Sequence, residues 1–305
     1  MHEAEGPVEV PAPSAEDFLA IMMGQWTDEQ ALEFEAYDDS VFDAFIAIHE
    51  ERYENARTLF QSALDNAEAP VYLYKELGTA SMLSNEPTAA TEAFETFLSR
   101  LPDGSDPDAR LTVHIALAQL AQANDQPEAA IAQFENAIDA MPNDYRPYLA
   151  LGSYLRTTDH PDQALEVLRS ALTVTRTTEP DWQLTLELGL VYRDLQRTDD
   201  AINALDQVLE FFKSRGVYEF PGAVTKSLAE LYAESGQTEQ SASMYRLFLE
   251  QYDGAESARM HLELGRQLVN LGLNDEARTA LQRAVALKPD PDTKRSAETL
   301  LVELG

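Results

Sequence analysis

Apolar residues recur along the chain at a spacing that places them on one face of an α-helix. In seven places, a small residue is followed by apolar or small residues four and seven positions later, which lie on one stripe of a helix. The seven trios are Ala56, Phe60 and Ala63; Ala90, Phe94 and Phe97; Ala130, Phe134 and Ala137; Ala164, Leu168 and Ala171; Ala201, Leu205 and Val208; Ser241, Tyr245 and Phe248; and Ala277, Leu281 and Ala284. Their first members lie 34, 40, 34, 37, 40 and 36 residues apart. A period in this range predicts stacked copies of one helical repeat.

A second helix is predicted upstream of each trio from the second one onward. Its mark is a Leu-Gly or Leu-Ala pair at a similar place in each repeat. The pairs are Leu77-Gly78, Leu117-Ala118, Leu151-Gly152, Leu188-Gly189, Leu228-Ala229 and Leu264-Gly265. Glycine inside a helix costs about 1 kcal/mol relative to alanine, and it is tolerable where another helix packs closely. Each repeat is therefore expected to be a pair of helices in close contact.

Prolines agree with this register. In three repeats a proline lies two residues after Asn or Asp and three residues before the trio: Asn85 and Pro87, Asp125 and Pro127, and Asp159 and Pro161. This spacing suits a polar N-cap followed by proline in the first turn of the second helix. We therefore expect these Asn and Asp side chains to cap the second helices.

The two ends of the array are expected to be covered by extra helices. Residues 292–305 place Ala297, Leu300, Leu301 and Leu304 on one side, which suits a closing helix. Near the other end, two capping-box spacings, Ser14 with Asp17 and Thr27 with Gln30, predict capping helices within 14–36. Residues 1–13 are predicted to form a flexible, acidic and proline-rich tail.

The combined Leu-Gly…Tyr…Ala…Phe…Ala…Pro pattern resembles the tetratricopeptide repeat (TPR) family, whose repeats are helix–turn–helix units. On this resemblance we place seven repeats at 37–70, 71–110, 111–144, 145–181, 182–221, 222–257 and 258–291. The resemblance implies an all-α fold, a right-handed superhelical α-solenoid of stacked antiparallel helix pairs with capping helices at both ends.

The charge of the chain limits its partners. Asp and Glu number 54 against 22 Lys and Arg, which gives a formal net charge of -32. Nucleic acid and anionic lipid are poor partners for such a surface. The acidity suits either a soluble protein adapted to high salt, as in halophiles, or a protein that attracts a basic partner. Because the charge is spread along the whole chain, we favour the first interpretation.

No motif for catalysis or cofactor binding was found. The chain has no cysteine, and it contains no HExxH, GxSxG, GxGxxG or glycine-rich phosphate loop. We therefore expect no enzyme activity, no cofactor and no metal. No apolar run approaches the roughly 18 residues of a membrane span, so membrane insertion is not expected. The N-terminus lacks the basic start and apolar stretch of a signal peptide, which favours a cytoplasmic location.

The resemblance also implies a ligand site. In TPR proteins the second, fifth, ninth, twelfth and thirteenth places of the first helices line a concave groove. Here these places carry the basic residues Lys75, Arg146, Arg156, Arg193, Lys226, Arg259 and Arg266, the acidic residues Asp194, Glu230 and Glu234, and the apolar residues Tyr72, Ile115, Leu149, Leu186, Leu190 and Leu262. An apolar floor with arginine at intervals suits a peptide or helix with acidic side chains. The alternative is that these cations pair with acidic groups on neighbouring helices.

The sequence thus predicts a non-enzymatic adaptor or scaffold that binds a peptide or helix of a partner protein, expected to be an acidic segment, in the concave groove. The alternative is an assembly or regulatory subunit that docks or self-associates through the apolar N-terminal segment FLAIMMGQW, residues 18–26. Exposure of Phe18, Leu19 and Met22 would favour this second hypothesis.

Overall fold

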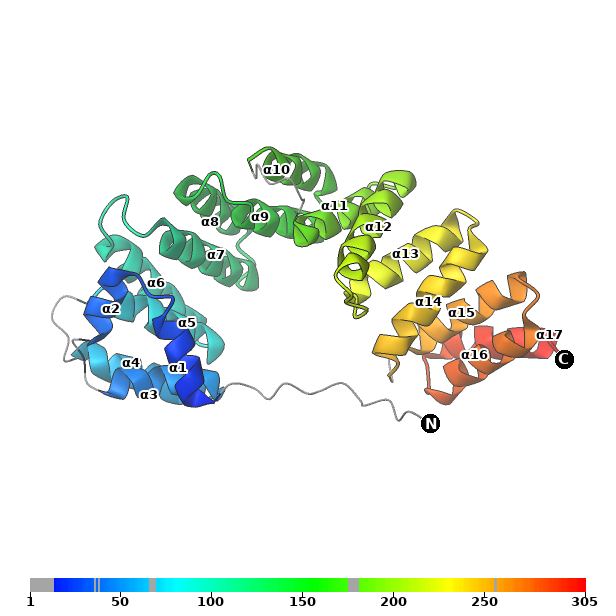
Figure 1. Ribbon diagram of the computed structural model, residues 1–305, viewed down its shortest axis with the longest axis horizontal. Coiled ribbons are helices and arrows are strands. Elements are labelled where there is room, and N and C mark those ends of the chain that lie inside the picture. The colour runs from blue at the N-terminus through cyan, green and yellow to red at the C-terminus, as the bar shows by residue number, and fades with distance from the viewer. Residues whose placement is uncertain (1–13, 36, 38, 66–69, 175–180, 255–256) are drawn as a thin grey trace. The chain divides into compact units, whose positions relative to one another are not determined.

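The computed structural model describes residues 14–35, 37, 39–65, 70–174, 181–254 and 257–305. Within these residues every regular element is an α-helix and there is no strand, so the predicted all-α class is confirmed (Figure 1). The chain forms two compact units, Met1–Met141 and Pro142–Gly305, called here the N-terminal and C-terminal units. The tail predicted at 1–13 lies outside the described residues.

The N-terminal unit stacks its helices in chain order. From α3 onward each helix packs against the next, while α1 contacts α3 and α2 contacts α5. The pairs α3–α4, α5–α6 and α7–α8 lie within the first three predicted repeats. The helices are α1 (Ala15–Met23), α2 (Asp28–Glu35), α3 (Asp39–His49), α4 (Tyr53–Asp65), α5 (Tyr72–Leu83), α6 (Pro87–Arg100), α7 (Pro107–Ala123) and α8 (Pro127–Ala140).

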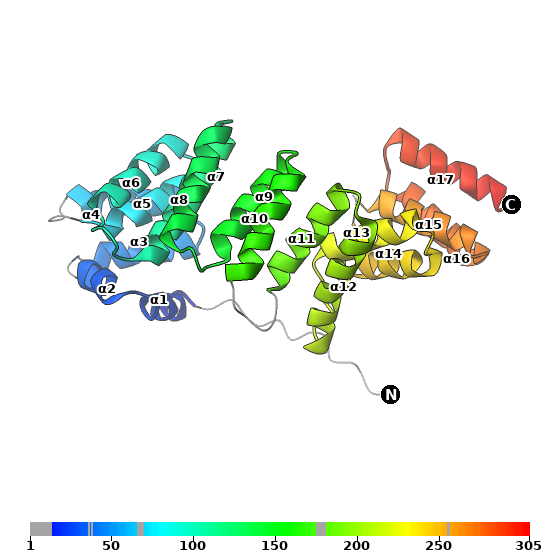
Figure 2. The same ribbon diagram turned by 90° about the horizontal axis from the view of Figure 1, so that it is seen from above.

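The C-terminal unit continues with four further pairs and a closing helix. Its helices are α9 (Arg146–Thr157), α10 (Pro161–Val174), α11 (Trp182–Asp194), α12 (Thr198–Ser214), α13 (Gly222–Glu234), α14 (Thr238–Tyr252), α15 (Ala258–Asn270), α16 (Asn274–Ala286) and α17 (Pro291–Glu303). Helix α11 contacts both α9 and α13, so the first helices of these repeats lie side by side (Figure 2). Helix α17 packs on α15 and α16 and buries Ala297 completely.

The repeated trios form the core, as their spacing predicts. Every member is buried except Phe248, which is half-buried and packs against the same core. Phe134 and Leu168, the large residues of adjacent trios, are both almost inaccessible to solvent. Because a helix turns once every 3.6 residues, one buried stripe per second helix is enough to hold it against the first helix.

The turns between paired helices correct one sequence interpretation. Asn85 and Asp125 do not cap α6 and α8, because the N-cap residues are Glu86 and Gln126 and neither makes a side-chain cap hydrogen bond. Instead the residue five positions before each trio has a left-handed backbone; these residues are Glu51, Asn85, Asp125, Asp159, Gln196, Gly236 and Gly272. The next backbone N–H then donates to the carbonyl five residues earlier, as Gln126 does to Ala121 at 2.9 Å. Asn and Asp are common here because they tolerate this conformation and so end the first helix.

Candidate functional site

The thirteen basic and apolar residues expected in the groove divide between the two units. Tyr72, Lys75 and Ile115 belong to the N-terminal unit, and the other ten belong to the C-terminal unit. Tyr72 is buried and Ile115 is half-buried. The ammonium of Lys75 lies 2.7 Å from the carboxylate of Glu76. These three side chains therefore offer little free surface to a ligand.

The ion pair of Lys75 also fixes its charge. Burial alone lowers the pKa of Lys75, but the carboxylates of Glu76, Asp106 and Asp108 outweigh burial and leave the pKa above its ordinary value. Lys75 lines a hollow of about 490 Å³ that residues of α2, α5 and α7 share with Trp26. A cation held in this way acts as a fixed charge within the unit.

In the C-terminal unit, an open hollow of about 390 Å³ lies between α9 and α11. Its apolar lining includes Leu149, Leu186 and Trp182, and Arg146 lies on its edge. Leu149 and Leu186 are half-buried, so part of each side chain is free to contact a ligand. The hollow therefore combines two of the predicted apolar positions with one of the predicted cations.

The N-terminus of α9 orients Arg146. The carboxylate of Asp144 accepts the backbone N–H of Arg146 at 2.8 Å and its guanidinium Nη2 at 2.8 Å. Partial burial raises the pKa of Asp144, but these hydrogen bonds from Arg146 outweigh it and hold the pKa below its ordinary value. The ionised carboxylate thus keeps the arginine beside the hollow.

Two of the predicted arginines connect neighbouring first helices, Arg156 through ion pairs and Arg193 through a hydrogen bond. Arg156 on α9 donates to Glu187 at 2.5 Å and lies 3.5 Å from Asp194, both on α11. Arg193 lies 3.1 Å from Asp194 and donates to the Ser227 hydroxyl on α13 at 2.7 Å. The pairs of Arg156 are the kind that the sequence left open as an alternative, while Arg193 pairs with an acid of its own helix. Together the contacts of the two arginines connect α9, α11 and α13.

The remaining predicted cations are more exposed than Arg156 and Arg193 and make fewer or longer ion pairs. Lys226 on α13 and Arg259 on α15 are exposed, and neither makes an ion pair within 4 Å in the part of the chain that the structure describes. Arg266 is exposed and lies 3.6 Å from Glu263. The apolar positions Leu190 and Leu262 are buried, so they act as packing residues.

The free cations share their surroundings with acidic groups. Burial is the largest cause that raises the pKa of Tyr245, and the negative charges of Glu263 and Glu230 raise it further. The positive charge of Arg259 lowers this pKa. The face of α13 and α15 therefore carries both signs of charge, with the basic side chains exposed.

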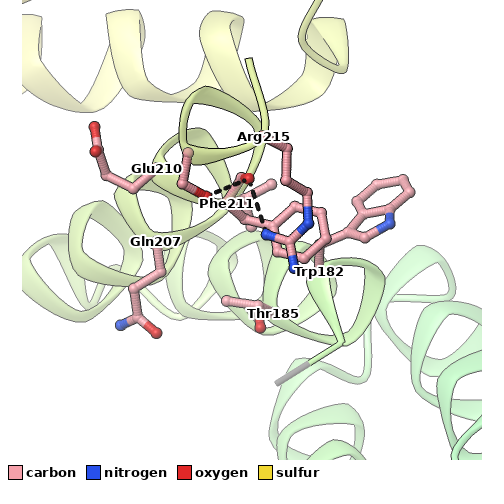
Figure 3. Close-up of a pocket in the computed structure, with 8 residues that line it drawn as sticks. Trp182, Thr185, Gln207, Glu210, Phe211 and Arg215 are labelled. Atoms are coloured by element: carbon pink, nitrogen blue, oxygen red, sulfur yellow. Dashed lines mark hydrogen bonds between the residues drawn. The ribbon is translucent and has the colours of Figure 1, made fainter. Parts of the chain in front are cut away.

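A second hollow, which sequence reasoning missed, lies between α11 and α12. It has a volume of about 410 Å³ and is lined by Trp182, Phe211 and Arg215, among others. The guanidinium carbon of Arg215 lies 3.7 Å from the centre of the Phe211 ring, and Figure 3 shows the Trp182 indole beside them. The aromatic and basic run FFKSRG at 211–216 was the signal in the sequence that could have indicated this hollow.

Two further features bear on the chemistry of the described residues. They contain no group of three His, Asp or Glu side chains placed to hold a metal ion. Among the described helices, none combines the length and the hydropathy that crossing a bilayer requires.

The fold of this chain is similar to those of several solved structures, some of which are named as TPR proteins. The C-terminal part of a TPR repeat-containing protein from Cytophaga hutchinsonii has a TM-score of 0.63 and 18% identity, covering 83% of this chain and 97% of that one. PilF of Pseudomonas aeruginosa has a TM-score of 0.60 and 20% identity, covering 74% and 95%. YrrB, a TPR protein with an unusual peptide-binding site, has a TM-score of 0.53 and 18% identity, covering 69% and 100%.

Sequence comparison gives the family. A search of curated proteins found no match to this chain. The family model described as tetratricopeptide repeat matches residues 115–180, 149–215 and 227–291, which together make up more than half of the chain. With its consecutive helix pairs, the chain belongs to the tetratricopeptide repeat family.

Proposed function

We propose that the protein is a non-enzymatic adaptor that binds an acidic peptide or helix of a partner protein on its C-terminal unit. The binding surface is the face of α9, α11, α13 and α15 that carries Arg146, Leu149, Leu186, Lys226 and Arg259, called here the α9–α15 face. Membership of a family of interaction scaffolds supports this function in general. The peptide-binding site named for YrrB, whose fold is similar, supports it by analogy.

The exposed, unpaired state of Lys226 and Arg259 is the observation that carries the proposal. In a chain with 54 acidic and 22 basic residues, most cations could find an internal partner. Arg156 and Arg193 do so on the same face. Exposed cations on α13 and α15, together with the apolar hollow between α9 and α11, are suited to a ligand that supplies both carboxylates and an apolar side chain.

The division of roles on this face follows from burial. Arg156 and Arg193 hold neighbouring helices together, while Lys226 and Arg259 remain available to solvent. The hollow between α9 and α11 would take the apolar side chain of the ligand, and Arg146 would meet a carboxylate at its edge. Since the contacts are exposed, binding should weaken as salt rises.

A random peptide library displayed on phage tests this proposal. The full chain should enrich peptides that combine Asp or Glu with a large apolar residue. The double variant Lys226→Glu and Arg259→Glu should bind the enriched peptides about tenfold more weakly, because charge reversal turns attraction into repulsion.

The matched control changes the charge equally away from this face. Arg169 on α10 and Lys288 after α16 are exposed, so Arg169→Glu with Lys288→Glu should leave binding close to that of the unchanged protein. Enrichment of peptides without an excess of acidic residues would contradict the proposal. Equal binding by the two double variants would contradict it as well.

The N-terminal docking hypothesis has no comparable support. Phe18, Leu19 and Met22 are half-buried and pack against the core of the N-terminal unit. The apolar side of this segment is therefore used within the chain.

A further inference from the structure

The N-terminal helices cover the places on α3 where a TPR groove would lie. Phe18 of α1 stacks on His49, with ring centroids 4.4 Å apart and planes inclined by 14°. Trp26 lies 5.8 Å from the ring of Phe45, and Phe34 of α2 lies 5.4 Å from it. Phe45 and His49 hold the ninth and thirteenth places of the first repeat, which face the groove in this family. Figure 1 shows α1 and α2 beside α3 and α5.

A carboxylate of the same segment caps the next first helix. The Glu33 side chain accepts backbone N–H groups of Val71 at 3.0 Å, Tyr72 at 3.0 Å and Leu73 at 2.9 Å. The N-cap residue of α5, Val71, makes no side-chain cap bond of its own. Glu33 therefore accepts hydrogen bonds from backbone N–H groups that have no partner within α5. Its negative charge also interacts favourably with the positive end of the helix dipole.

The segment 14–35 has the features of a ligand more than those of a core element. Helix α1 buries none of its residues and α2 buries only Phe34. Helices α4 to α16, by contrast, each bury three or more residues; the smallest sets are those of α4 and α8. Ile21 and Leu32 are 58% and 71% exposed. Elements with so few buried contacts open at low free-energy cost.

The composition of the segment completes this description. Residues 14–35 carry six acidic side chains and no basic one: Glu16, Asp17, Asp28, Glu29, Glu33 and Glu35. Four of its apolar side chains, Phe18, Leu19, Met22 and Trp26, pack against the core. The segment is thus an acidic pair of helices, of which α1 packs on α3 and α2 on α5.

We propose that the face of α3 and α5 is a second helix-binding surface and that residues 14–35 are its displaceable internal ligand. The partner that displaces them is an acidic amphipathic helix whose carboxylate takes the position of Glu33 at the start of α5. This inference rests on contacts within the N-terminal unit and is independent of the α9–α15 face.

A synthetic, fluorescein-labelled peptide of residues 14–35 tests the proposal by anisotropy on the full chain. The unchanged protein should bind it weakly, because its own segment fills the site. Glu33→Ala in the protein should increase the affinity about tenfold, since apparent affinity follows the fraction of molecules with an open site. The control Glu35→Ala removes an equal charge from an exposed side chain of the same helix and should leave binding unchanged.

Two further measurements separate a displaceable ligand from a fixed cap. The labelled peptide carrying its own Glu33→Ala change should lose affinity for the Glu33→Ala protein. Hydrogen exchange of that protein should show faster exchange in α1 and α2 while the amides of α5 beyond Leu73, which do not bond to Glu33, stay protected. Equal peptide affinity of the Glu33→Ala and Glu35→Ala proteins would overturn the proposal. Loss of protection in α5 beyond Leu73 together with α1 and α2 would also overturn it, because the segment would then be an inseparable part of the fold.

Discussion

The side chain of Leu168 on α10 fills the space that a side chain at Gly152 on α9 would need. A Cβ atom on Gly152 would lie 2.5 Å from Cδ2 and 2.6 Å from Cγ of Leu168, well inside van der Waals contact. The same relation, between residues 16 positions apart, joins Gly78 to Phe94, Gly189 to Leu205 and Gly265 to Leu281. The glycine in the first helix therefore sets how closely the second helix approaches.

Gly152→Ala should destabilise the fold even though alanine favours helices. Propensity alone would stabilise by about 1 kcal/mol, but overpacking a filled core costs about 1–3 kcal/mol. Leu168 is fully buried, so it cannot move aside into solvent. We expect a net loss of about 1 kcal/mol in the free energy of unfolding, measured by urea denaturation. Gly254→Ala is the control, since a Cβ there would meet nothing within 4 Å, and a stabilised Gly152→Ala protein would show that the helices can separate freely.

Arg156→Ala should destabilise the C-terminal unit, because it leaves Glu187 without its partner. The two side chains are 17% and 11% exposed. Removing one member of a buried pair costs about 3–5 kcal/mol, and partial exposure reduces this to an expected loss of about 2–3 kcal/mol. Thermal melting of Arg156→Ala and of Arg266→Ala, whose side chain is 45% exposed, measures the difference.

The second partner of the pair provides a check on Arg156. Adding Glu187→Gln to Arg156→Ala should restore part of the lost stability, since the unpaired buried charge is gone. If Arg156→Ala melts like the unchanged protein, the ion pair contributes nothing and Arg156 is free to serve a ligand. Peptide binding measured on the same variants decides between these roles.

Asp253 should titrate at unusually low pH. Hydrogen bonds from the Ser257 hydroxyl and then from His261 lower its pKa to about 2. The unfolded value is about 3.9, so ionised Asp253 stabilises the fold above that pH. This contribution should disappear as the pH falls from about 4 to about 2.

Carboxyl carbon NMR measures this titration directly. Ser257→Ala removes the largest cause of the shift and should move the Asp253 midpoint upward, towards the unfolded value. The difference in unfolding free energy between the unchanged protein and Asp253→Asn should be present above pH 4 and vanish near pH 2. A midpoint that Ser257→Ala leaves unchanged would show that other groups set the pKa.

Salt should stabilise the whole chain. The net charge of -32 produces like-charge repulsion that is weakly screened below about 0.1 M ionic strength, where the Debye length exceeds about 10 Å. The melting temperature should therefore rise from low salt to molar KCl, and equally in choline chloride if screening is the cause. A flat melting temperature would refute the interpretation of the acidity as an adaptation to salt.

The repeat pattern predicted the helix pairs because the spacing within each trio is enough to show that its residues are buried. Phe134 needs no knowledge of distant residues, since its spacing from Ala130 and Ala137 already defines a buried stripe. The turns were harder, because Asn85 has a side chain that suits both an N-cap and a left-handed helix end. Only the backbone hydrogen bonds separate these two roles.

The candidate site was less predictable because its contacts are between helices far apart in sequence. The groove positions identified Arg156, but its main partner Glu187 occupies a place outside that set. Glu33 bonds to backbone groups 38 to 40 residues away, and no local motif signals such a cap. The sequence thus indicates which residues share a face, while the structure determines which of them are already paired.

The left-handed turns have a consequence for protein engineering. Seven turns adopt one backbone conformation, yet only Gly236 and Gly272 have the residue that adopts it without strain. At Glu51 and Gln196, with φ of 58° for both, a residue with a Cβ costs about 1 kcal/mol or more relative to glycine. Replacing each with glycine should raise the thermal resistance of the chain without touching either proposed binding face. Two of the seven turns thus already contain the glycine that would stabilise the other five.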